Sequence, residues 1–477
     1  MNETMNMGKE EKSIIKNDRL KCTSKEGEAS FANLDENRKQ NSLAKRLSPS
    51  LQPAEPSSAT PSAGDTPATP PRKSSRNKNY EELKPYIPQN DNEENYALLT
   101  HYLMMEKGEA KERKRKELIE NFAFEEQSLN DAKAFFEKKE IPFCHKKDTS
   151  FTFIDLFAGI GGFRLAMQAN GGRCVFSSEW DDAAKQTYYE NYGEVPFGDI
   201  TKAETKALIP EHFDVLCAGF PCQPFSNAGL KKGIEDTRGT LFYHIAEILS
   251  NHKPKAVFLE NVRGLISNDN GNTIRIVLKT ITSMGYRCNI PSEVIESGSL
   301  QKLKAEASKL VLSAKDYGIP QNRPRIYIVL WREDVAIESF LYPLPQKKKI
   351  SVGSILEKSV SDTYTISDRL WAGHQKRRIE NERKGNGFGY CLFNSDSSYT
   401  STISRRYYKD GSEILIEQVG KNPRKLTPRE AANLQGFPKA FHIPQSDTKA
   451  YQQFGNSVAV PVVQFISEQI VKQIIER

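Results

Sequence analysis

The sequence predicts an α/β protein with a doubly wound, mostly parallel sheet, a smaller domain of strands and loops, and a partly disordered N-terminal extension. Two observations predict the sheet. From Phe151 onward, short apolar runs alternate with stretches able to form helices, which is the pattern of βαβ units. The first of these runs ends in a cluster of glycines, as in sheets that bind a nucleotide-like ligand. The pattern stops after Pro345, where Gly, Tyr, Ser and basic residues become more frequent.

The N-terminal part predicts two segments. Residues 1–90 are expected to be disordered, because Ser48–Ser75 is rich in Pro, Ser, Thr and Ala and buries too little apolar surface to offset its ordering entropy. Residues 91–150 are expected to be helical, with apolar residues near helical spacing. Gly108 and the charged run Lys111–Lys116 are expected to divide two helices. No clear helix-turn-helix signature appears, so packing on the main domain is the expectation.

The main domain is predicted to span residues 151–345. Five apolar runs are expected to form strands, and a sixth follows a polar insertion: Thr152–Phe157, Cys174–Ser178, Val195–Phe197, Phe213–Ala218, Ala256–Leu259 and Arg325–Leu330. Residues 346–450 predict the smaller, mainly β and loop domain, with a strand near Ser412–Gln418. Residues 451–477 predict an apolar helix that returns to the main domain.

The composition excludes several classes of protein. The net charge of +7 fits a polyanionic partner but does not prove one. Seven cysteines without CxxC pairs argue against a disulfide framework and a structural zinc site, and no metal site is predicted. No apolar run approaches the roughly 20 residues that span a bilayer, and the N-terminus lacks a signal-peptide core. A cytoplasmic protein without a membrane partner is the expectation.

Three strand ends predict a ligand site. Glycines from Gly159 let the chain turn tightly and leave its backbone open to a ligand. Glu179 follows twenty residues later, where a carboxylate binds ribose hydroxyls in such sheets. Trp180 is placed to cover an adenine, and Asp199 to accept from an exocyclic amine. No Walker-type lysine is present, so S-adenosylmethionine and dinucleotides both remain possible.

A second set of residues predicts a nucleophilic reaction in the same crevice. Cys222 follows a strand between two prolines that stiffen the turn presenting its thiol. A thiol pKa of about 8.5 leaves a few per cent thiolate at neutral pH, a fraction that nearby cations raise. Glu260 ends the neighbouring strand, and Arg323 and Arg325 precede another.

This set suits methylation of cytosine at carbon 5. A thiolate that adds to carbon 6 makes carbon 5 enamine-like and able to accept a methyl group. A protonated carboxyl at ring nitrogen 3 assists the addition, and arginine anchors the carboxyl or the carbonyl oxygen of the base. The attack needs access to the face of the ring, so the base must leave the helical stack.

With these motifs in order, the chain from Phe151 to its C-terminus resembles the cytosine-5 DNA methyltransferase family. The motifs are Phe157–Gly162, Glu179-Trp180, Gly198–Ile200, Pro221–Ser226, Arg238–Leu241, Glu260–Val262, Gln321–Arg325, Arg424–Glu430 and Gly455–Val458. The resemblance implies the fold of S-adenosylmethionine-dependent methyltransferases, with S-adenosyl-L-methionine as cofactor. Two departures are Pro324, where many relatives have Glu, and extra sequence at about Pro291–Ser308.

The resemblance also implies roles for individual residues. Cys222 is the nucleophile, Glu260 engages the cytosine, and Arg323 and Arg325 complete the base pocket. The implied cofactor residues are Phe157, Gly159, Gly161, Glu179, Trp180, Asp199, Ile200, Pro221, Leu241, Asn456 and Val458. The implied DNA contacts are Gln223, Ser226, Lys231 and Lys232, the two lysines in a segment that corresponds to a mobile loop in the family.

The smaller domain is expected to read the DNA sequence. The segments Lys384–Tyr390, Ser401–Ser404 and Arg406–Ile416 resemble recognition regions of the EcoRII–Dcm-type subgroup of restriction–modification methyltransferases. Arg405 and Arg406 are the expected readers, since arginine pairs with guanine by two parallel hydrogen bonds; the alternative is that one or both bind phosphate. The resemblance implies a CCNGG or CCWGG site, with CCGG next.

The expected partner is double-stranded DNA, bound by a monomer in the bacterial cytoplasm at the nucleoid. A cognate restriction endonuclease acting on the same site is possible. Three other readings stay open. They are a tRNA cytosine-5 methyltransferase, which the missing Cys-Phe-Thr signature disfavours, a non-catalytic DNA-binding regulator, and, more distantly, an NAD-linked enzyme. A regulatory or targeting role for the first 150 residues also stays open.

Overall fold

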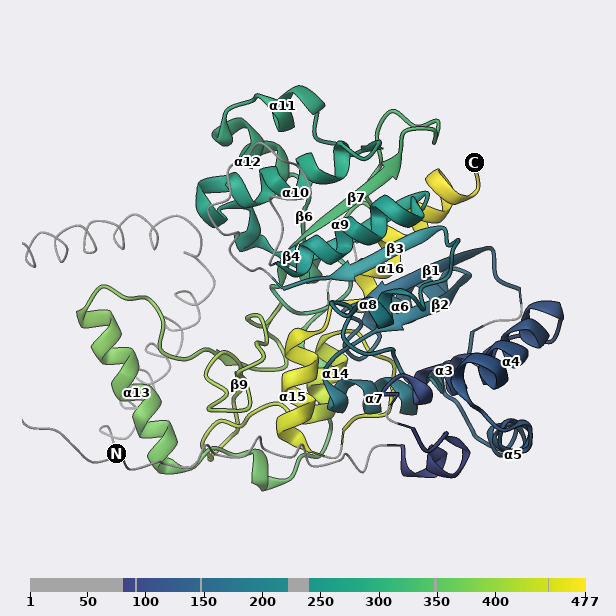
Figure 1. Cartoon of the computed structure of the whole chain (residues 1–477). Helices are drawn as coiled ribbons and strands as arrows, with labels where there is room; N and C mark the ends of the chain where they lie inside the picture. Colours follow the sequence, from purple (N-terminus) through teal and green to yellow (C-terminus); the bar gives the residue numbers. More distant parts are fainter. Residues whose placement is uncertain (1–79, 91, 146–147, 222–239, 347–349, 445) are drawn as a thin grey trace, which may run out of the picture. The chain divides into compact units, whose positions relative to one another are not determined.

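The computed structural model describes residues 80–477, apart from residues 91, 146–147, 222–239, 347–349 and 445. The described residues belong to one unit, Lys78–Arg477, whose centre is a seven-stranded sheet (Figure 1). The strand order is β2-β1-β3-β4-β7-β5, and β6 pairs with β7. The strands are β1 (Phe151–Leu156), β2 (Gly172–Ser178), β3 (Val215–Gly219), β4 (Ala256–Val262), β5 (Tyr286–Arg287), β6 (Val311–Ser313) and β7 (Pro324–Arg332).

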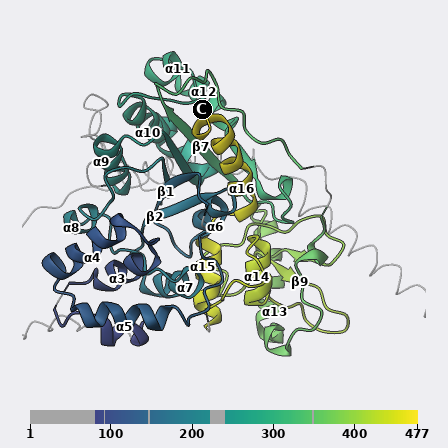
Figure 2. The same ribbon diagram turned by 90° about the vertical axis from the view of Figure 1, so that its right-hand side faces the viewer.

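The predicted mostly parallel α/β sheet is confirmed. Strands β2, β1, β3 and β4 pair in parallel, whereas β7 runs antiparallel to β4, β5 and β6. Figure 2 shows helices α9 and α10 on one side of the sheet and α6 and α16 on the other. Their bounds are α6 (Gly162–Ala169), α9 (Leu241–His252), α10 (Asn272–Thr282) and α16 (Val460–Ile470).

One predicted strand is wrong. Val195–Phe197 makes an isolated parallel bridge between Phe197 and Ser178, not a strand. The amide of Phe197 donates to the Ser177 carbonyl at 2.8 Å, and the amide of Glu179 donates to the Phe197 carbonyl at 2.9 Å. The Val195 amide donates to the Thr100 hydroxyl at 2.9 Å and not to β2, so the ladder does not extend toward Val195. The bridge still places the chain after Phe197 beside the end of β2.

The predicted helical region, residues 91–150, holds three helices, α3 (Asn95–Met104), α4 (Glu109–Phe122) and α5 (Glu126–Phe136), and the 3₁₀ helix η1 (Glu81–Tyr86) lies before it. Gly108 separates α3 from α4, as predicted. The charged run Lys111–Lys116 lies inside α4 and does not divide two helices, because Lys, Arg and Glu all favour helix. Leu83 in η1 is buried, so residues 80–90 are not disordered as predicted; residues 1–79 lie outside the described part of the chain.

Helices α3, α4 and α5 share a hydrophobic core with the sheet. Leu98, Leu99 and Leu118 are fully buried in the same cluster as Phe176 of β2 and Leu216 of β3. Burying such side chains contributes roughly 1.5–3 kcal/mol each. Residues ahead of Phe151 are therefore part of the body that carries the sheet.

The region predicted to form the smaller domain contains less strand than expected. Residues 346–450 were predicted to be mainly β and loop, but among their described residues β8 (Leu392–Phe393) and β9 (Leu415–Ile416) have two residues each. The expected strand Ser412–Gln418 shrinks to β9 because its partner chain turns away at Asn394, whose carbonyl accepts from the Ser397 amide. Helices occupy much of the remainder, namely η6 (Val352–Ser354), η7 (Asp362–Tyr364), α13 (Asp368–Arg383) and α14 (Pro428–Leu434).

The C-terminal segment is helical, and its two helices are α15 (Asp447–Asn456) and α16, the latter followed by the π-helical turn η8 (Val471–Ile475). Asp447–Ile475 has the length and apolar composition of a membrane span, but 56% of its most apolar window is buried. Ser457 breaks the segment, and α16 packs on α6, as expected for a core helix. The remaining described helices are α7 (Asp182–Tyr192), α8 (Ala203–Lys206), η3 (Arg263–Ile266), η4 (Asn268–Gly271), α11 (Ser292–Glu296), α12 (Leu300–Ser308) and η5 (Ala314–Asp316).

Asp155, the penultimate residue of β1, leads to a prediction about stability. Its side chain is fully buried, and burial raises its pKa from 3.8 to about 8, although the charge of Arg164 opposes this. The folded protein therefore keeps a proton on Asp155 that the unfolded chain loses above about pH 4. Relative to Asp155→Asn, the wild type should lose about 1.4 kcal/mol of unfolding free energy per pH unit up to about pH 8.

Thermal unfolding of both proteins across this pH range measures the effect. The difference in melting temperature should shift in favour of Asp155→Asn as the pH rises and then level off. If the difference in melting temperature between the two proteins stays constant from about pH 5 to about pH 8, Asp155 does not carry the buried proton.

Candidate active site

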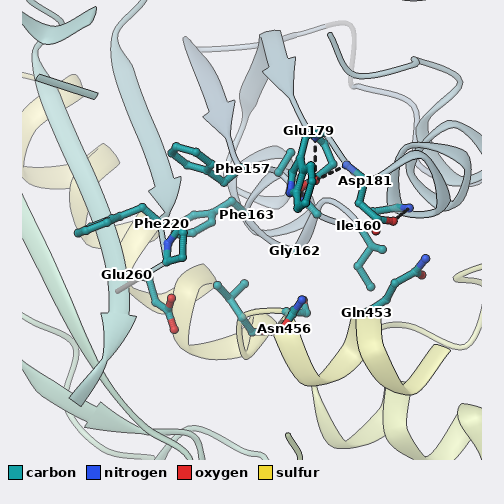
Figure 3. A pocket seen from close by; sticks show the side chains of 18 of the residues that line it. Phe157, Ile160, Gly162, Phe163, Glu179, Asp181, Phe220, Glu260, Gln453 and Asn456 are labelled. Atoms are coloured by element: carbon teal, nitrogen blue, oxygen red, sulfur yellow. Dashed lines mark hydrogen bonds between the residues drawn. The ribbon is translucent and has the colours of Figure 1, made fainter. Parts of the chain in front are cut away.

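A cavity of about 700 Å³ lies at the carboxyl edge of the sheet, where β1 to β4 end beside α15 and the start of α16. Figure 3 shows Glu179 and Asp181 at one end of this cavity and Glu260 at the other, with Phe163 and Asn456 between them. Most of the residues proposed from the sequence line it: Phe157, Gly159, Glu179, Trp180, Asp199, Ile200, Pro221, Leu241, Glu260, Arg323, Arg325, Arg405, Asn456 and Val458.

The turn between β1 and α6 forms one wall. Phe157 and Gly159 both have φ values of 56°, in the left-handed region. At Gly159 an added Cβ would have no heavy atom within 4 Å, so its backbone faces open space. Gly161, proposed as a cofactor residue, does not line the cavity; its φ of 80° turns the chain, and an added Cβ would overlap the ring of Tyr192.

Glu179 is fixed at the end of β2 by backbone amides. Its Oε2 accepts from the Gly159 amide, and its Oε1 accepts from the amides of Trp180 and Asp181, all at 2.8 Å. Burial raises the pKa of this carboxyl, while the three amides lower it. The Trp180 side chain is 75% exposed at the rim of the cavity. A fixed carboxylate therefore lies beside an exposed aromatic ring.

The other end of the cavity holds an acid and an arginine. Glu260 lies in β4, opposite Tyr327 of β7, and its Oε1 is 3.2 Å from Nε of Arg325. Both side chains are nearly buried. Burial raises the pKa of Glu260, and the charges of Arg325 and Arg323 oppose this increase without cancelling it. More of this carboxyl is therefore protonated at neutral pH than of an exposed glutamate.

Arg323 differs from Arg325 in its partners. Its guanidinium donates to the carbonyl of Ile403 at 3.1 Å and to those of Gly455 at 3.1 Å and Ser457 at 2.6 Å. The residue is 2% exposed, and burial lowers its pKa to about 9. Arg323 thus joins three segments around the cavity, while Arg325 pairs with Glu260.

The proposed nucleophile and four proposed DNA contacts lie outside the described residues: Cys222, Gln223, Ser226, Lys231 and Lys232. The chain just before them is well defined. Pro221 lines the cavity, and the Asn261 side chain donates to the Phe220 carbonyl at 2.9 Å. The two arginines proposed as sequence readers are both exposed, and Arg405 lines the cavity whereas Arg406 does not.

Several lining residues were not found from the sequence. They are Ile160, Phe163, Asp181, Asn261, Lys449, Gln452 and Gln453, together with some of their neighbours. Asn261 lies in β4 and belongs to the sequence motif Glu260–Val262, so its position was a usable signal. Gln453 in α15 donates to the Ala183 carbonyl at 2.9 Å, a contact between segments so distant in sequence that no local pattern indicates it.

Comparison with known proteins decides the family. A model described as "C-5 cytosine-specific DNA methylase" matches residues 151–472. The chain belongs to this family. The methylase is 53% identical over 333 residues to the type II methyltransferase M.SsoII of Shigella sonnei, covering 69% of this chain and 82% of that protein. It is 52% identical over 334 residues to M1.ScrFI of Lactococcus lactis subsp. cremoris, covering 69% and 80%.

A solved structure supports the fold. The crystal structure of S. pombe Dnmt2 methyltransferase matches with a TM-score of 0.52 at 20% identity, covering 68% of this chain and 98% of that one. The family assignment makes the protein a DNA (cytosine-5-)-methyltransferase that uses S-adenosylmethionine.

The cavity fits this cofactor. The fixed Glu179 carboxylate suits the two ribose hydroxyls, and the exposed Trp180 ring suits the face of the adenine. The open space over Gly159 lets a ligand approach the backbone. Residues at this end of the cavity would hold the cofactor, with Glu260 and Arg325 left free at the other end.

We expect Glu179→Gln to weaken cofactor binding. The amide group puts a donor against backbone amides that need an acceptor, at a cost of about 1.5–3 kcal/mol, or at least tenfold in affinity. Calorimetric titration with S-adenosylhomocysteine measures this. Glu190→Gln, the same change in α7 outside the cavity lining, should bind like the wild type. Equal affinity of the Glu179 and Glu190 variants would contradict the assignment.

Proposed function

We propose that this methylase protects one duplex DNA sequence by methylating a cytosine that leaves the helix and enters the cavity beside Glu260. The observation that carries the proposal is the buried Glu260–Arg325 pair, which shares one cavity with Pro221, Glu179 and Asp199. Cys222 directly follows Pro221 in the sequence. The acid, the arginine and the residue that directly precedes the proposed nucleophile therefore share one cavity with the proposed cofactor site.

The reaction follows from these groups. The Cys222 thiolate adds to carbon 6 of the cytosine, and Glu260 supplies a protonated carboxyl to ring nitrogen 3, so that negative charge does not build up on the ring. The raised pKa of Glu260 favours that protonated form. Arg325 keeps the carboxyl oriented at 3.2 Å. When bound, S-adenosylmethionine supplies the methyl group to carbon 5. Loss of the carbon-5 proton then restores the double bond and releases the cysteine.

Duplex DNA with an extruded base is the substrate that this cavity favours. A thiolate reaches carbon 6 only from the face of the ring, which is covered inside the helical stack. Arg405 comes from residues 346–450 yet lines the same cavity, so the proposed recognition region extends to the site of the chemistry. Exposed Arg406 is left to pair with a guanine edge.

For the target sequence we propose CCNGG or CCWGG, with CCGG next. The support is the resemblance of Lys384–Tyr390, Ser401–Ser404 and Arg406–Ile416 to one subgroup of the family. Relatives at 53% and 52% identity are type II methyltransferases, which favours a protective role beside a restriction endonuclease. We further propose that the protein acts as a monomer on chromosomal DNA in the bacterial cytoplasm.

We expect Cys222→Ser to abolish methylation, with a loss of at least about 10³-fold, because serine is not ionised at neutral pH. Cofactor affinity should stay within about twofold of the wild type. Bisulfite sequencing of DNA from cells expressing each protein measures methylation, and 5-fluorocytosine-containing duplexes test for the covalent adduct. If the wild type forms no covalent adduct with such DNA in the presence of cofactor, the mechanism is wrong.

We expect methyl transfer to duplex oligonucleotides that carry CC and GG around a variable central base. Transfer of labelled methyl groups to a series with A, C, G, T or no base at the centre separates CCNGG, CCWGG and CCGG. A tRNA transcript is the matched control and should accept about 10³-fold less, since each lost base contact costs about 1–3 kcal/mol. Activity confined to sites without flanking CC and GG refutes the assignment.

A further inference from the structure

A carboxylate from outside the family-matched region contacts the cofactor end of the cavity. Glu94 precedes α3, well before residue 151 where the family match begins. It is 7% exposed. Its carboxylate accepts from the Gly198 amide at 2.9 and 3.1 Å and from the Thr205 hydroxyl at 2.6 Å. The acceptor thus joins the N-terminal helices to the segment between β2 and β3.

The Glu94 side chain does not cap the helix that it precedes. It occupies the N-cap position of α3, where an acidic side chain commonly accepts from the first free amides of the helix. Here the side chain makes no such hydrogen bond. Instead, Asn92 accepts from the Glu94 amide at 3.0 Å, which leaves the Glu94 carboxylate directed at Gly198.

The anchored segment carries Asp199. Phe197 is already bonded to the end of β2, where Glu179 lies, through the Ser177 and Glu179 backbone. Glu94 fixes the next amide along the chain, and Asp199 and Ile200 then line the cavity. At Gly198 an added Cβ would lie 3.0 Å from Oε1 of Glu94, so the missing side chain permits this approach.

The helix behind Glu94 is a rigid support. Leu98 and Leu99 of α3 are fully buried in the core beneath the sheet. Thr100, one and a half turns on from Glu94, accepts from the Val195 amide at 2.9 Å, so α3 holds the segment at a second point before Gly198. The position of Glu94 is therefore set by packing that does not depend on the cavity.

We infer that Glu94 is a positioning residue for S-adenosylmethionine binding, which holds the Asp199 segment in place from outside the cavity. The inference rests on the proposed cofactor role of Asp199. Without the Glu94 carboxylate, the Gly198 amide loses its acceptor and the segment after Phe197 has one anchor fewer. Ordering Asp199 then costs part of the free energy of cofactor binding. This cost weakens binding without altering the chemistry at Glu260.

The test compares binding with turnover. For Glu94→Ala in the full-length protein, we expect the Kd for S-adenosylhomocysteine by calorimetry and the KM for S-adenosylmethionine both to rise about tenfold. The kcat at saturating cofactor and the affinity for duplex DNA should stay within about twofold. Glu94→Gln keeps one acceptor oxygen and should lie between alanine and the wild type. Glu109→Ala is the matched control, because its exposed carboxylate pairs with Arg113 within α4 and does not contact the Asp199 segment.

Asp199→Ala tests the cofactor role of Asp199 separately from the positioning role of Glu94. If it weakens cofactor binding while folded Glu94→Ala binds within twofold of the wild type, the inference fails and the cavity assignment stands. If Asp199→Ala has no effect, the cofactor role of Asp199 fails and the inference with it. A parallel fall in DNA affinity and kcat for Glu94→Ala means a general structural defect and also overturns it. Should Glu94→Ala not fold, Glu94→Gln decides by the same criteria.

Discussion

The cavity depends on one buried guanidinium. Arg323 lies immediately before β7 and donates to the backbone of Ile403, Gly455 and Ser457. Two chain segments far apart in sequence, at Ile403 and at 455–457, are thereby fixed around one planar group, whose five donors match such an arrangement better than a lysine would. Removing a charge from water is costly, and the three carbonyl dipoles offset that cost only while both segments stay in place. The cavity therefore forms as a unit.

Two acidic residues, Glu179 and Glu260, lie at opposite ends of this cavity. Three backbone amides donate to Glu179, whereas Glu260 pairs with the Arg325 guanidinium, and burial raises the pKa of both carboxyls. A carboxyl fixed by amides on both oxygens suits recognition of hydroxyl groups, and a carboxyl that faces a single guanidinium suits proton exchange. The difference in surroundings, not in residue type, separates a binding acid from a reactive one.

The sequence predicted the strand-end residues well for a topological reason. Parallel strands end at one edge, so Glu179 after β2 and Glu260 at the end of β4 had to converge once the βαβ pattern was recognised. Sequence reasoning failed for residues whose roles depend on contacts between distant segments of the chain. Nothing local distinguishes Arg323 from Arg325, and nothing near Glu94 points to Gly198. The false strand at Val195–Phe197 has the same cause, because the Val195 amide donates to Thr100 of a helix distant in sequence and not to β2.

The reversed direction of β7 has a consequence for how this family can vary. Because β7 runs against β4, its first residues, not its last, reach the edge of the sheet where the cavity lies. The chain between these two strands can therefore lengthen, provided that it returns to the same starting point. Helices α11 and α12 occupy this stretch, and Arg323 and Arg325 still line the cavity. An antiparallel strand gives the fold a place where sequence can be added without reaching the cavity.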